Sequence, residues 1–154
     1  MIIRTAERDD IAAIVALLAD DQLGSTRETP GDPPAACYLD AFEAMARQAG
    51  NRYLIAIDED DEIAGCLQLT LIAGLSRRGM TRAQIEGVRV AASHRGAGVG
   101  EALMRHAIEQ ARAAGCGLVQ LTTDKRRPDA HRFYDRLGFV ASHEGMKLDL
   151  TAGG

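Results

Sequence analysis

The chain has 154 residues, of which 46% are hydrophobic and 26% charged, proportions typical of one globular domain with a substantial core. A net charge of −4 argues against a nucleic-acid-binding protein, and no apolar run approaches the roughly 18 residues that a membrane span needs. The acidic residues that soon follow Met1 leave no secretory signal. The scattered Cys37, Cys66 and Cys116 form no metal-binding pattern. We therefore expect a cytoplasmic protein with reduced thiols and no metal.

Hydrophobic periodicity and turn residues predict alternating strands and helices along the chain. In chain order these are a strand at 2–6, a helix at 7–21, a loop at 23–34, a helix at 34–50, two strands joined by an acidic turn within 52–72, a strand at 81–90, a helix at 98–114, a strand at 117–124, a helix at 128–138 and a hairpin at 139–150. This order indicates an α/β domain with a mixed sheet. We place the domain at 1–150 and a tail at 151–154.

Charge is distributed unevenly along the sequence. Residues 77–136 contain twelve Lys and Arg against six Asp and Glu, a net charge of +6, while the rest of the chain carries −10. One part of the protein could therefore hold an anion and another could attract a cation, provided that these stretches also separate in space.

Residues 95–100, with the sequence RGAGVG, lie between a predicted strand and a predicted helix. The N-terminus of a helix presents unpaired N–H groups and the positive end of the helix dipole. Glycines allow the backbone to bend around phosphate oxygens, and Arg95 adds a full positive charge. The stretch is either a phosphate-binding loop or an inert turn. It lacks the Lys of a P-loop, and its glycine spacing does not match a dinucleotide-binding fingerprint.

The stretch VRVAASHRGAGVGEALM resembles the acetyl-CoA signature of the GNAT superfamily of N-acetyltransferases, with Arg95, Gly98 and Gly100 at the signature positions. A second stretch, HRFYDRLGF at residues 131–139, resembles the helix that follows this signature in the family. The order and separation of the two stretches also match. The resemblance implies a single-domain GNAT-like fold, in which helices flank a mixed, mostly antiparallel sheet with splayed central parallel strands.

The resemblance also implies where acetyl-CoA binds. The loop N–H groups would hold its pyrophosphate, and the backbone of the preceding strand would pair with its pantetheine arm. At a position where the family often has an Asn, this chain has Arg127, which could instead contact a CoA phosphate. The residues expected at the cofactor are Val88, Arg89, Val90, Arg95, Gly96, Ala97, Gly98, Val99, Gly100, Glu101 and Arg127.

Acetyl transfer to an amine needs a proton for the leaving thiolate and an acceptor for the amine's proton. The resemblance places Tyr134 near the thioester sulfur, and its hydroxyl, with an ordinary pKa of about 10, could protonate a thiolate whose ordinary pKa is about 8.5. Alternation along the strand predicts that Glu86 shares a face with Gln84, Val88 and Val90. Glu86 could attract a cationic amine and accept its proton, or it could be a structural partner of an Arg such as Arg89.

The leading hypothesis is an acetyl-CoA-dependent N-acetyltransferase acting on a small amine. The alternatives are a non-catalytic acyl-CoA-binding or sensing module on the same fold, and an acyltransferase that uses a longer acyl-CoA. The acids of segment 20–50, together with Glu86, favour a cationic acceptor. We expect no nucleic-acid or membrane partner, and a homodimer is one state that fits the family.

Overall fold

The computed structural model describes residues 1–151, without the side chain at position 128. The remaining residues of the predicted tail, 152–154, lie outside the described residues. The strands are β1 (Ile2–Thr5), β2 (Asn51–Ile57), β3 (Ile63–Ile72), β4 (Arg82–Val90) and β5 (Leu118–Leu121). The helices are α1 (Ile11–Ala19), α2 (Ala36–Ala46), α3 (Ser76–Gly79), α4 (Val99–Ala113) and α5 (Pro128–Arg136), with short 3-10 turns at Arg8–Asp10, Gly24–Thr26 and Ala92–His94. Within the described chain, no helix is long and apolar enough to cross a membrane.

The chain forms two compact units, at residues 1–121 and 122–154. The first unit contains a five-stranded sheet in the order β1-β2-β3-β4-β5. Neighbouring strands are antiparallel except β4 and β5, which are parallel. The mixed, mostly antiparallel sheet flanked by helices confirms the predicted fold class. The parallel pair lies at one edge of this sheet rather than at its centre.

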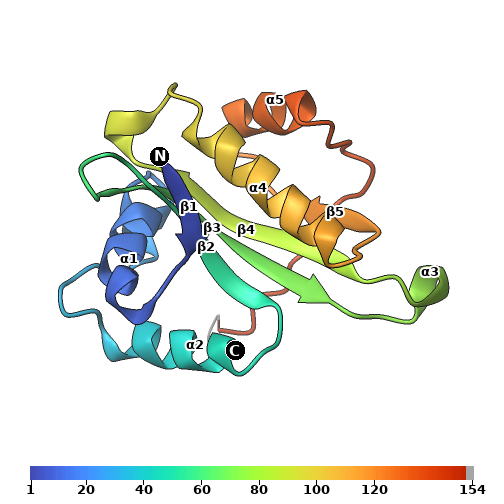
Figure 1. Ribbon diagram of the computed structural model, residues 1–154, viewed down its shortest axis with the longest axis horizontal. Coiled ribbons are helices and arrows are strands. Elements are labelled where there is room, and N and C mark those ends of the chain that lie inside the picture. Colours follow the sequence, from blue (N-terminus) through green and yellow to red (C-terminus); the bar gives the residue numbers. More distant parts are fainter. Residues whose placement is uncertain (152–154) are drawn as a thin grey trace. The chain divides into compact units, whose positions relative to one another are not determined.

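Helix α4 covers one face of the sheet (Figure 1). Its apolar stripe contributes Leu103, Met104 and Ala107, all fully buried, as the periodicity of the sequence predicts. The helix approaches β3 closely at Gly65, where an added Cβ would lie 2.9 Å from a Leu103 side-chain carbon. This face supplies most of the large, fully buried side chains of the first unit: Leu54, Leu67, Leu69, Ile85, Leu103 and Met104.

Helix α1 packs on the opposite face of the sheet (Figure 1). Ile14 forms a buried cluster there with Ala6, Ile55 and Cys66. The entry to α1 is held by Asp10, whose carboxylate accepts two hydrogen bonds from the Arg4 guanidinium, at 2.8 and 3.1 Å, and one from the N–H of Glu7, at 2.7 Å. A bidentate pair of this kind sets the direction in which the chain leaves β1.

The second unit contains α5, but the hairpin predicted at 139–150 is wrong, since no residue from 137 to 151 is in a strand. The apolar residues that suggested the hairpin remain on the surface, with Val140, Met146 and Leu148 between 81% and 94% exposed. Alternation stabilises a strand only when one face is buried against a neighbour, and these side chains gain no such burial.

Candidate active site

The glycine loop leads directly into α4, as the sequence predicts. Gly98 is the residue before the helix and has φ +82°, and Gly96 has φ +79°. These left-handed conformations favour glycine. No described atom lies within 4 Å of where a Cβ at either position would be, so backbone conformation rather than space requires glycine here.

The first N–H groups of α4 are available to a ligand. No side chain caps the helix, and its first backbone hydrogen bond back to the loop runs from the N–H of Ala102 to the carbonyl of Gly98. Across residues 1–151, the N–H groups of Val99, Gly100 and Glu101 therefore have no backbone acceptor outside their own helix. Together with the helix dipole they form a site suited to an anion such as a pyrophosphate.

Arg95 lies at the start of the loop, with its guanidinium directed toward the end of α1. Its Nε lies 3.4 Å from the Val90 carbonyl oxygen, and one Nη lies 3.4 Å from the Asp20 carbonyl oxygen and 4.0 Å from the Asp20 carboxylate. The Arg95 side chain is 59% exposed. These long, solvated contacts hold it weakly, so it could turn toward a phosphate in the loop at little cost.

Strand β4 contains a bulge that changes which residues share a face. Glu86 lies opposite Gln68 of β3, whereas Arg89 lies opposite Cys66. Between these two pairs, β4 therefore contains one more residue than β3, which is a β-bulge. The extra residue falls at Gly87 or Val88, and Gly87 has φ +61°. The prediction that Glu86 shares a face with Val88 and Val90 is therefore wrong, because strict alternation ends at the bulge. Arg89 takes the face of Glu86 instead.

The backbone of β4 beyond Ile85 has an open side. The ladder between β4 and β5 ends at the pair Ile85 and Leu121. The N–H of Ala91 donates to the Ala64 carbonyl of the β3 side. Because backbone groups of successive residues point to opposite sides of a strand, those of Val90 point away from β3. An extended ligand could add to this edge as a further strand does.

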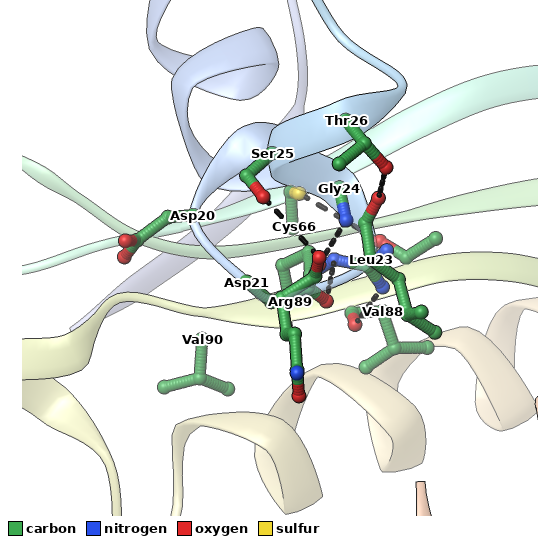
Figure 2. A network of polar contacts seen from close by, with 12 residues as sticks. Asp20, Asp21, Leu23, Gly24, Ser25, Thr26, Cys66, Val88, Arg89 and Val90 are labelled. Carbon is green, nitrogen blue, oxygen red and sulfur yellow. Dashed lines mark hydrogen bonds and ion pairs between the residues drawn. The ribbon is translucent and has the colours of Figure 1, made fainter. Parts of the chain in front are cut away.

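Arg89 connects β4 to the loop after α1 (Figure 2). Its Nε lies 3.5 Å from an Asp21 carboxylate oxygen, and one Nη donates to the Val88 carbonyl at 2.9 Å. The other oxygen of Asp21 accepts a hydrogen bond from the N–H of Gly24. Both charged side chains are 19% exposed, so little water weakens the pair. The guanidinium of Arg89 is thus engaged with Asp21 and with its own strand.

These contacts bear on the proposed cationic acceptor. Asp20 and Asp21 each face an arginine, so two of the acids in segment 20–50 are offset and contribute less to attracting a cation than the sequence suggests. Glu86, by contrast, is exposed and pairs with no described cation. Its carboxylate makes one long contact, 3.4 Å from the Gln84 amide nitrogen to Oε1. Among the described residues, Arg89 therefore pairs with Asp21 and not with Glu86.

Tyr53 of β2 lies beneath the bulge and was not singled out from the sequence. Its hydroxyl oxygen would lie 3.5 Å from a Cβ at Gly87. Burial raises the pKa of Tyr53, and the nearby Cys66 and Glu86 raise it further. The hydroxyl therefore stays protonated and can donate a hydrogen bond. Burial also raises the pKa of the Cys66 thiol to about 12, which leaves it without nucleophilic thiolate at neutral pH.

Tyr134 and Arg127 belong to the second unit. The Tyr134 ring is half-buried and makes edge-to-face contacts with Phe133 and Phe139, at centroid distances of 5.1 and 5.9 Å. Such contacts limit the rotamers open to the tyrosine. Arg127 is the residue before α5, and its N–H donates to the Asp124 carbonyl at 2.9 Å. Their roles toward acetyl-CoA remain predictions.

His94 supports the approach to the glycine loop. Its Nε2 lies 2.9 Å from an Asp58 carboxylate oxygen, and its Nδ1 lies 2.9 Å from the Ser93 hydroxyl. Asp58 also accepts hydrogen bonds from the N–H groups of Asp60 and Glu62 in the turn between β2 and β3. The histidine therefore joins two turns.

Comparison with known proteins identifies the class of protein that this fold and loop define. Residues 13–139 match the acetyltransferase (GNAT) family. The chain belongs to this family and is an acyltransferase, and the family in general uses acetyl-CoA as the donor.

Three relatives narrow the comparison. The chain is 33% identical over 150 residues to a glucosamine 6-phosphate N-acetyltransferase of Trypanosoma brucei brucei, covering 96% of this chain and 95% of that one. It is 33% identical over 121 residues to a streptothricin acetyltransferase of Streptomyces lavendulae, covering 74% of this chain and 61% of that protein's length. It is 29% identical over 139 residues to an aminoalkylphosphonate N-acetyltransferase of Salmonella typhimurium, covering 90% and 82%.

Solved structures share the fold. A transcriptional regulator from Bacillus halodurans C-125 superposes with a TM-score of 0.93 at 46% identity, covering 97% of this chain and 99% of that one. An acetyltransferase from Trypanosoma brucei superposes with a TM-score of 0.79 at 30% identity, covering 97% and 99%.

Proposed function

We propose that the protein transfers the acetyl group of acetyl-CoA to the primary amine of a small cationic molecule. The observation that carries this proposal is the glycine loop at the start of α4, with its uncapped N–H groups, in a chain of the acetyltransferase family. The residues present fit the donor: the loop suits a pyrophosphate, and the open edge of β4 at Val88 and Val90 suits an extended pantetheine arm.

Two arginines are candidates for further contacts to the donor. Arg95 is held only by long contacts and is free to exchange Asp20 for a phosphate. Arg127, at the start of α5, is a second candidate for a phosphate contact. Arg89 is engaged with Asp21, so we assign it the support of β4 and of the loop after α1 rather than a direct contact with the donor.

The reaction joins the amine nitrogen to the thioester carbon, and the carbon–sulfur bond then breaks. Bound acetyl-CoA supplies the activated acetyl group. Tyr134 donates its hydroxyl proton to the departing thiolate, since the two groups have similar ordinary pKa values. Glu86 attracts the ammonium form of the acceptor and takes up its proton directly or through water. Two relatives named for amine acceptors, glucosamine 6-phosphate and aminoalkylphosphonates, support an amine as the acceptor.

Two measurements test the proposal: calorimetric titration with acetyl-CoA, and thiol release over a panel of primary amines. We expect micromolar binding and amine-dependent release. Tyr134→Phe should lower kcat by about 100-fold or more while the Kd for acetyl-CoA stays within about twofold. Tyr38→Phe, which removes a tyrosine hydroxyl on α2 that contacts Thr29 and Glu28, is the matched control for the Kd of acetyl-CoA. Equal kcat in wild type and Tyr134→Phe would remove the tyrosine as the acid.

A sensing module is the second candidate, supported by the likeness to a structure described as a transcriptional regulator. Binding of acetyl-CoA without thiol release across the whole panel would favour it. Faster turnover with butyryl-CoA than with acetyl-CoA would instead favour an enzyme for longer acyl groups.

A further inference from the structure

Seven polar side chains form two rows across the sheet, on the face where α1 packs. The first row crosses β2, β3 and β4, and the second crosses β2 to β5. We call them the polar rows. Their members, by strand register, are Tyr53, Gln68 and Glu86 in the first row and Asn51, Thr70, Gln84 and Gln120 in the second. All lie within the first unit of the chain, and they begin where the apolar cluster of Ile55 and Cys66 ends.

The hydrogen bonds within the rows run in one direction. Gln120 donates its amide N–H to the Gln84 side-chain oxygen at 2.8 Å, and the Gln84 amide nitrogen faces Glu86 at 3.4 Å. On the other side, Gln68 donates to the Asn51 side-chain oxygen at 2.9 Å, and Thr70 donates to it at 3.3 Å. The rows thus use N–H and O–H donors internally.

Some acceptor oxygens in the polar rows receive no hydrogen bond from the residues that the structure describes. Within the described part of the chain, the side-chain oxygens of Gln68 and Gln120 accept no hydrogen bond, and neither does Oε2 of Glu86. Gln68 and Gln120 are half-buried and Glu86 is exposed. None of these three oxygens is among the buried side-chain atoms of the described residues that lack a partner, so all three are open to solvent and to a ligand. Two amide oxygens and one carboxylate without a bonded donor suit a ligand that is cationic and rich in donors.

We infer that the polar rows bind the acceptor, and that the acceptor is a primary amine carrying at least one further hydrogen-bond donor, a hydroxyl or a second amino group, close to the ammonium. This rests on the proposed function. The ammonium lies against Glu86, and the neighbouring donor is held by Gln68 or Gln120. The Tyr53 hydroxyl, protonated and beside Gly87, completes the first row as a donor.

The same arrangement disfavours an acceptor with an anionic group next to its amine. A phosphonate or carboxylate would face the Glu86 carboxylate and the amide oxygens, and like-charge contacts of this kind carry a penalty. The oxygens left without a protein donor lie on three strands, at Gln68, Glu86 and Gln120. This distribution favours a specificity surface over internal cross-links of the sheet.

The test compares kcat/KM for three amines of similar size: 2-aminoethanol, propylamine and 2-aminoethylphosphonate. Wild type should prefer 2-aminoethanol over propylamine by about tenfold, the effect of one neutral hydrogen bond, and should use 2-aminoethylphosphonate least. Gln68→Met and Gln120→Met should together bring the ratio of kcat/KM for 2-aminoethanol to that for propylamine close to one. Gln110→Met on α4, on the other side of the sheet, is the matched control.

The outcomes distinguish failure of this inference from failure of the proposed acetyltransferase function. Thiol release from acetyl-CoA with some amine, combined with an unchanged ratio in the two methionine variants, would overturn the role of the rows and leave the proposed function standing. A wild-type preference for the phosphonate would do the same. Where no amine releases thiol, calorimetric titration with 2-aminoethanol against propylamine still tests the rows, and equal affinities would overturn them.

Discussion

On the face of the sheet that α4 covers, Leu54, Leu67, Leu69 and Ile85 are 1% exposed or less, whereas the polar rows on the opposite face remain half-buried or exposed. The inner strands β2, β3 and β4 supply both sets, and β5 adds Gln120 to the polar rows. Burial of aliphatic side chains against α4 stabilises the fold. On the opposite face, amide, hydroxyl and carboxylate side chains occupy positions where aliphatic side chains would otherwise be buried. Departures of this kind from an apolar sheet face are typical of functional sites.

The largest effect tests the stability assigned to the α4 face. Leu103→Ala should lower the free energy of unfolding by about 2–5 kcal/mol, because it removes a fully buried side chain and leaves a cavity. Denaturant unfolding measures this loss. Gln68→Leu on the other face should change the same quantity by less than about 1 kcal/mol. If both variants lost the same free energy of unfolding, the polar rows would have a structural role and the two faces of the sheet would not differ in function.

The close approach of α4 to β3 gives the next prediction. Gly65→Ala should destabilise the protein by about 1–3 kcal/mol through overpacking, since the new Cβ would lie 2.9 Å from the Arg89 carbonyl oxygen and 2.9 Å from the Leu103 side chain. Thermal and denaturant unfolding measure this loss of stability. Gly31→Ala, where the nearest atom would lie 3.6 Å away, is the control and should be near neutral.

Substitution of a glycine in the loop should lower the affinity for acetyl-CoA. Gly98→Ala places a Cβ on a residue with φ +82°, which costs roughly 1–2 kcal/mol for a non-glycine residue. We expect about a tenfold higher Kd for acetyl-CoA by calorimetry, because the loop relaxes away from the conformation that exposes its N–H groups. Ala97→Gly is the neighbouring control. An unchanged Kd would show that the loop does not hold the donor.

The smallest effect concerns the start of α1, on the face of the polar rows. Burial alone would raise the pKa of Asp10, but hydrogen bonds from Arg4 and from the N–H of Glu7 outweigh it and lower the pKa. A lowered folded-state pKa stabilises the protein above the unfolded value of about 3.9, and this stabilisation is lost as the pH falls through the folded value.

Asp10→Asn should therefore reduce stability at pH 7 by no more than about 1 kcal/mol, since the Arg4 side chain is 39% exposed and solvent weakens the pair. The variant should differ less from wild type below about pH 4. Urea unfolding across this pH range measures the difference. A constant difference down to pH 2 would contradict the assignment of the effect to ionised Asp10.

Much of the fold could be predicted from local pattern. The apolar stripe at 98–114 correctly predicted α4. The glycines within residues 95–100 correctly predicted the loop, because glycine is the residue type that readily adopts the left-handed conformation found at Gly96 and Gly98. The terminal hairpin failed because alternation in 139–150 says nothing about whether a neighbouring strand is present. Short α3 was missed because its Arg77 and Arg78 have positive φ, which no propensity predicts.

By itself, the sequence determined the backbone site: a strand, a glycine-rich turn and an amphipathic helix are local features, and their N–H groups follow from local geometry. Only the tertiary structure decided what the side chains do. The bulge at 87–88 turned Arg89 to the face of Glu86, and the loop after α1 brought Asp21 to Arg89. Strand register aligned Gln68 with Glu86 and Gln84 with Gln120. Register and long-range pairing depend on residues far apart in the chain, so no local reading of this sequence could have produced them.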